Sequence, residues 1–110
     1  MLKSARNGGS RLYLHAIHLG EVYYITFRAH GDKNADLAYA RIKAFPLKLI
    51  DSIDEPLLLT AALFKAQFPI SYADSFAAAL SNRLECTLLT GDSEFKSLEK
   101  AGRLTVEWLK

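Results

Sequence analysis

The sequence predicts an α/β fold with a largely parallel sheet. Short segments with strand character alternate along the chain with longer amphipathic segments, the order expected when helices connect parallel strands. The run Thr87-Leu88-Leu89-Thr90 is typical of a strand buried inside such a sheet. At 110 residues the chain has the size of one domain, so we expect residues 1–110 to form a single unit.

The first half of the chain begins with a pattern of helical residues that Gly8 and Gly9 would end. Because an isolated helix this short is not stable, we interpret it as the last turn of a longer element. Gly31 is expected to end a later helix. The elements expected here are a helix end over 1–7, a strand over 11–14, helices over 18–30 and 32–45, and a strand over 46–50.

The second half shows clearer start and stop signals. Asp54 and Glu55 give one helix an acidic first turn, Pro69 separates it from the next helix, and Gly102 should end the last one. The elements expected here are helices over 54–67 and 72–84, a strand over 86–91, a short helix over 93–100 and a strand over 104–108.

Composition excludes several classes of protein. Half of the residues are hydrophobic and a quarter are charged, as in ordinary globular proteins, and the net charge of +2 permits contact with a polyanion without requiring it. The single Cys86 cannot form an internal disulfide bond, and no cysteine and histidine cluster has zinc-finger spacing. With no apolar segment of membrane-spanning length and a polar start, we expect a soluble, cytoplasmic protein.

Two aspartates should meet at one edge of the sheet. A helix from Tyr72 to Leu84 covers roughly 20 Å, and the strand after it returns about the same distance. Asp92, just after that strand, therefore lies near Asp74 at the start of the helix. Ligands of open α/β sheets bind at this carboxyl edge of the strands. Both carboxylates are thus candidates for a functional site.

Glu21 is a third candidate for the same site. Almost all of its neighbours between Ile17 and Ile25 are apolar or aromatic, and an acid in such surroundings is rarely buried without a partner. It lies in the first turn of a helix that follows a strand, as Asp74 is expected to. The same end of the sheet should therefore receive all three acids.

Each acid also has a purely structural explanation. Ser71-Tyr72-Ala73-Asp74 fits a capping box, in which the acid accepts a hydrogen bond from the backbone of the capping serine. Asp92 could bond to the backbone of its own turn. Taken singly, each acid is explained equally well by either role. His15, His18 and Glu21, at three-residue intervals, also suggest a transition-metal site, which we set aside because H-E-x-x-H is absent.

Clustered carboxylates repel one another, and a divalent cation removes that repulsion. Ligation by oxygen alone suits Mg²⁺ or Mn²⁺, and such centres hydrolyse phosphodiesters with an activated water and no covalent protein nucleophile. Ser71 and Thr90 have no histidine partner that would make them nucleophiles. We expect them to hydrogen-bond to the acids or to orient them.

Four segments together resemble a PIN domain of the VapC toxin type: residues 17–24, 71–74, 90–95 and 106–109. The resemblance spans nearly the whole chain and implies a three-layer α/β/α fold. It implies that Glu21, Asp74 and Asp92 are catalytic metal ligands of a Mg²⁺- or Mn²⁺-dependent ribonuclease. Such proteins are usually homodimers, and a cognate antitoxin inhibits them by inserting into the site.

The chain departs from the family pattern at its N-terminus. The family's first catalytic Asp lies on an N-terminal strand, which a helix follows, and this chain starts too late to contain either. That strand is the central one, expected between the strands at Leu12 and Leu88. We therefore expect an N-terminally truncated PIN-like domain with an open sheet centre. It would be a weak or inactive ribonuclease.

Two alternatives to the ribonuclease hypothesis follow from that departure. The chain could be a catalytically inactive PIN remnant that serves as a dimerisation or antitoxin-binding module. It could also be a small α/β domain whose acids only cap helices.

Overall fold

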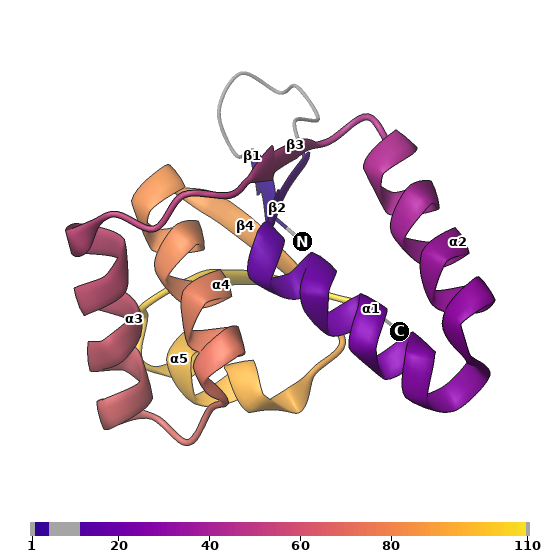
Figure 1. Ribbon diagram of the computed structural model, residues 1–110. Helices are drawn as coiled ribbons and strands as arrows, with labels where there is room; N and C mark the ends of the chain where they lie inside the picture. Colours follow the sequence, from indigo (N-terminus) through magenta and orange to yellow (C-terminus); the bar gives the residue numbers. More distant parts are fainter. Residues whose placement is uncertain (1, 5–11, 110) are drawn as a thin grey trace.

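The computed structural model describes residues 2–4 and 12–109 of the chain, drawn in Figure 1. Strands and helices alternate through the described ranges, as the sequence predicts. The strands are β1 (Leu2–Ser4), β2 (Leu12–His15), β3 (Lys48–Ile50), β4 (Cys86–Thr90) and β5 (Thr105–Trp108). The helices are α1 (Ala16–His30), α2 (Asp32–Ala44), α3 (Glu55–Gln67), α4 (Tyr72–Leu84) and α5 (Lys96–Lys100), with a 3₁₀ helix, η1 (Ser93–Phe95), before α5.

The five strands form one sheet in the order β3-β2-β1-β4-β5. β2 pairs with β3 and β4 with β5 in parallel, whereas β1 is antiparallel to both of its neighbours. Four of the five strands therefore run in the same direction. The prediction of an α/β fold with a mostly parallel sheet is confirmed.

The centre of this sheet differs from the prediction. Leu2–Ser4, expected to be helical, form β1, which fills the position that we expected to be open. Leu2 pairs with Tyr13 of β2 and with Leu88 of β4, and it is only 2% exposed. An open centre would leave the backbone groups of β2 and β4 unpaired, so tertiary pairing overrides the local helical pattern. The rest of the predicted helix end, residues 1 and 5–7, lies outside the described residues.

The main core lies where α4 packs against β1, β2 and β4, with α3 beside α4. Ser75 to Ser81 are all buried, and the small side chains of Ala77, Ala78 and Ala79 let α4 approach the sheet closely. The largest buried apolar side chains around α4 are Leu57, Phe64, Ile70, Phe76, Leu80, Leu88, Phe95 and Leu98. Because Ser75 to Ser81 are buried, α4 has a defined position on the sheet, and its first turn carries Asp74.

Helices α1 and α2 form a hairpin that lies apart from α3 in Figure 1. Gly31 joins them with a φ of 87°, which confirms the predicted helix stop, because only glycine adopts this region without strain. The Tyr23 hydroxyl donates a 2.8 Å hydrogen bond to Asp36, linking the two helices. Apolar side chains remain exposed on the hairpin: Tyr24, Ile25, Phe27 and Leu37. None of the helices in the described ranges has the length and apolar character needed to span a membrane.

Shortening the buried Leu2 side chain of the central strand β1 should strongly destabilise the protein. We predict that Leu2→Ala lowers the free energy of unfolding by about 2–5 kcal/mol, the usual cost of emptying a buried leucine site. Leu109→Ala, at a position 59% exposed, is the matched control and should change it by no more than about 0.5 kcal/mol. Urea denaturation followed by circular dichroism measures both. Equal, small effects would show that β1 is not part of the folded core.

Candidate metal centre

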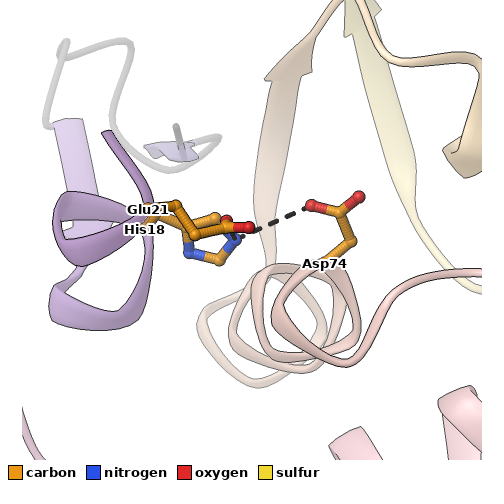
Figure 2. A group of neighbouring side chains, drawn as sticks. All are labelled: His18, Glu21 and Asp74. Carbon is orange, nitrogen blue, oxygen red and sulfur yellow. Dashed lines mark ion pairs between the residues drawn. The ribbon is translucent and has the colours of Figure 1, made fainter. Parts of the chain in front are cut away.

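Three acids from separate parts of the sequence meet near the carboxyl ends of β2 and β4. Glu21 lies on α1, which follows β2, Asp74 lies in the first turn of α4, and Asp92 follows β4. Figure 2 shows His18 and Glu21 extending from α1 toward Asp74. One donor atom from each of His18, Glu21 and Asp74 lies within 4.8 Å of the others. Asp74, Asp92 and Glu94 satisfy the same condition, so Asp74 belongs to both groups.

The start of α4 is capped in a way that leaves the Asp74 carboxylate available. Ser71 Oγ accepts a hydrogen bond of 3.2 Å from the Asp74 N–H, as predicted. In a capping box, however, Asp74 would accept the Ser71 N–H. That N–H instead donates to Glu94 Oε1 at 2.8 Å. The capping-box explanation of Asp74 is therefore wrong, and Glu94 takes the capping role.

The turn after β4 fixes Asp92 through its own backbone. Thr90 Oγ1 accepts a hydrogen bond of 3.0 Å from the Asp92 N–H, and Asp92 Oδ1 accepts one of 2.9 Å from the Glu94 N–H. Thr90 thus orients Asp92, as the sequence predicted for it. The predicted hydrogen bond between the Asp92 side chain and the backbone of its own turn is confirmed, and it uses only Oδ1.

The two histidines have different roles. His15 Nδ1 caps α1 by accepting the Ile17 N–H at 3.1 Å, and its Nε2 lies 3.1 Å from the Ser52 carbonyl oxygen. This cap starts α1 two residues earlier than predicted, so Glu21 lies in the second turn of the helix and not in the first turn as predicted. His18 lies one helical turn before Glu21 and joins the cluster. His15 is thus in neither group of possible metal donors, whereas His18, which we had set aside, is in one of them.

Glu94 was also missed by sequence reasoning. It lies two residues after Asp92, within the segment 90–95 that carried the family resemblance. The short η1 helix turns the chain so that both carboxylates approach Asp74. The signals available in the sequence were the i, i+3 spacing of His18 and Glu21 and the position of Glu94 in this motif.

Burial and mutual repulsion raise the pKa values of two acids in the cluster. Burial raises the pKa of Asp74 to about 6, and the charges of Asp92, Glu94 and Glu21 add to the effect. Burial also raises the pKa of Glu21, again with the help of Asp92 and Glu94. The pKa of His18 is lowered to about 4, chiefly by burial, so that its ring is neutral at pH 7. A neutral histidine cannot compensate the negative charge around it.

The donor set fits a divalent cation. His18 Nε2 is buried and has no hydrogen-bond partner among the described residues, although Glu21 Oε1 and Asp74 Oδ1 lie 3.8 and 3.9 Å away. These distances exceed those of hydrogen bonds. An unpartnered nitrogen beside carboxylates with raised pKa values is a set of donors that a divalent cation would stabilise.

Comparison with known proteins identifies the family. The family model described as "PIN domain" matches residues 2–101. The chain therefore belongs to the PIN-domain family. No curated protein matches it significantly by sequence.

Solved structures show the same fold at low sequence identity. VapBC2 from Rickettsia felis, bound to a DNA fragment from its promoter, has a TM-score of 0.69, with 17% identity over 91% of this chain and 76% of that one. VapBC-1 from nontypeable Haemophilus influenzae has a TM-score of 0.68, with 17% identity over 96% and 79%. DNA-bound VapBC from Salmonella typhimurium has a TM-score of 0.67, with 17% identity over 88% and 74%.

Without metal, the raised pKa of Asp74 should make stability depend on pH. The folded protein binds this proton more tightly than the unfolded chain does, so the free energy of unfolding should fall as pH rises from about 4 to about 6. Asp74→Asn should flatten this slope and raise stability at pH 7 by on the order of 1 kcal/mol, after allowance for screening by solvent.

Urea titrations in EDTA between pH 4 and 8 measure this effect. The control is Glu107→Gln, which removes an exposed carboxylate from β5, outside the cluster. An unchanged slope in Asp74→Asn would show that burial and the neighbouring acids do not raise the pKa of Asp74.

Proposed function

We propose that the chain is a divalent-metal-dependent ribonuclease of the toxin type, which hydrolyses RNA phosphodiesters. Glu21, Asp74 and Asp92 are its catalytic metal ligands, and the ion is Mg²⁺ or Mn²⁺. The observation that carries the proposal is the convergence of these acids on Asp74, whose pKa is raised to about 6. Membership of the PIN-domain family over residues 2–101 supports it, and we propose that residues 1–110 form a single domain.

The chain's own residues set up the reaction by positioning negative charge. Ser71 donates a hydrogen bond to the Asp74 side chain and lowers its pKa against the larger effect of burial. Thr90 fixes Asp92, and Glu94 ties the 93–95 turn to the start of α4 through the Ser71 N–H. A bound divalent ion would supply charge neutralisation for the phosphate and a nucleophilic water of lowered pKa. No side chain need act as a covalent nucleophile.

The partners proposed are an RNA substrate and a cognate antitoxin. The structural neighbours are VapBC assemblies, and we transfer that kind of partner to this chain as part of the proposal. The exposed apolar side chains of the α1–α2 hairpin supply a surface that an antitoxin could cover. The single cysteine, Cys86, is buried and forms no disulfide bond within the chain, which fits action in the reducing cytoplasm, where RNA is available.

One observation favours the inactive alternative. In the family the first catalytic acid lies on the central strand, whereas the strand described there is Leu2-Lys3-Ser4, which has no acid and runs antiparallel to its neighbours. A PIN remnant that binds an antitoxin or a second copy would need no such acid. The two functions are separated by measuring cleavage and binding on the same preparation.

Cleavage should be weak, metal-dependent and lost on removal of Asp92. We predict slow hydrolysis of single-stranded RNA with Mn²⁺ or Mg²⁺, none in EDTA, and a decrease of roughly a hundredfold or more for Asp92→Asn, because misplacing the reacting groups by about 1 Å costs that much. Glu107→Gln is the control and should match wild type. A folded, Mn²⁺-binding chain that cuts no RNA in a broad panel would establish the binding-module alternative.

A homodimer remains part of the proposal, but its basis changes. β1 pairs with β2 and β4, so the open strand edges that we expected to drive association do not exist. The support now lies on α3, whose outer face carries Leu58, Leu59 and Leu63 at 42%, 54% and 57% exposure. A helix that is apolar on all sides is normally covered on all sides.

Light scattering coupled to size exclusion tests the dimer. At micromolar concentration we expect twice the mass of the chain, and the double variant Leu59→Glu, Leu63→Glu should be monomeric without loss of helical content. Lys65→Glu, on the same helix, is the control for added negative charge. A monodisperse wild-type monomer would contradict the dimer.

A further inference from the structure

His18 is the one nitrogen donor among the clustered residues of the described ranges, and the expected oxygen-only metal site does not use it. It lies on α1 one turn before Glu21, and its Nε2 atom is buried without a hydrogen-bond partner among the described residues. Burying a polar nitrogen without a partner costs free energy, so such atoms are rare in folded proteins. The imidazole therefore requires an explanation that helix packing does not provide.

The ring is oriented with Nε2 toward the acids. The backbone of Ala73 also interacts with the ring. Histidines that bind metals through one ring nitrogen usually donate the other ring N–H to a carbonyl or carboxylate, which fixes the ring orientation.

The spacing of the donor atoms suits a shared ion. Nε2 lies 3.8 Å from Glu21 Oε1 and 3.9 Å from Asp74 Oδ1 (Figure 2). The Glu21 and Asp74 donor atoms lie within 4.8 Å of each other. Adjacent ligands of an octahedral ion at about 2.1 Å are about 3.0 Å apart, so side-chain rotations that move these atoms by on the order of 1 Å would bring all three to bonding distance.

We propose that His18 is a nitrogen ligand of the metal centre, and that it makes the centre prefer Mn²⁺ and later first-row ions such as Co²⁺ over Mg²⁺. The inference rests on the metal site of the proposed function and specifies which ion that site selects. Imidazole is a good ligand for transition metals, whereas Mg²⁺ prefers oxygen and keeps its waters. A site with one nitrogen donor should therefore differ in its affinity for these ions more than a site of carboxylates alone.

The first test measures affinity by isothermal titration of Mn²⁺, Co²⁺ and Mg²⁺ into the full chain. His18→Gln removes the nitrogen but keeps a polar side chain, and it should weaken Mn²⁺ and Co²⁺ binding by on the order of tenfold or more, with a much smaller effect on Mg²⁺. His30→Gln, at the exposed end of the same helix, is the matched control and should leave all three affinities unchanged.

The second test detects the bond directly. Pulsed electron paramagnetic resonance of the Mn²⁺-loaded wild-type chain should show coupling to a directly bound imidazole nitrogen. His30→Gln should retain this coupling and His18→Gln should lose it. Mn²⁺ binding without any nitrogen coupling would overturn the role of His18 while leaving the carboxylate metal site intact. A chain that binds none of the three ions would overturn the metal site itself, and with it the proposed ribonuclease.

Discussion

The common direction of four strands is the constraint on which the site depends. β2 and β4 both end at the same edge of the sheet. α1 starts at that edge, the turn after β4 lies there, and α4 begins there as well. This topology brings together acids that are far apart in the sequence. Glu21 is 53 residues before Asp74, and Asp92 is 18 residues after it. β1 can run in the opposite direction without disturbing it, since its role is to pair the two halves of the sheet.

The hydrogen bonds around the cluster hold like charges close together. Glu94 occupies the capping position that Asp74 would otherwise fill, and Thr90 holds Asp92 in its turn. These local bonds stabilise the backbone, while burial and proximity raise the pKa values of Asp74 and Glu21. The same residues therefore stabilise the fold through hydrogen bonds and destabilise it through repulsion between their charges. This arrangement is expected where a bound cation would remove the repulsion.

Sequence reasoning was most successful where periodicity and spacing determine structure. The Tyr72–Leu84 helix has the predicted bounds, and the helix and strand lengths brought Asp74 and Asp92 together as calculated. It failed where long-range contacts decide. Leu2–Ser4 become a strand only because β2 and β4 flank them, and the Ser71 N–H turns to Glu94 rather than Asp74 because η1 brings that side chain close. The sequence contains no motif for His18, and its place beside Asp74 depends on how α1 packs against α4.

The most direct test of the account is the anomalous diffraction of crystals soaked in Mn²⁺. We expect a peak between α1 and the start of α4, about 2.0–2.2 Å from His18 Nε2 and from oxygens of Glu21 and Asp74. The same peak should be absent in Asp74→Asn, because Asp74 belongs to both donor groups. Mn²⁺ bound only at other surfaces, with the Glu21, Asp74 and Asp92 carboxylates free of metal, would contradict it.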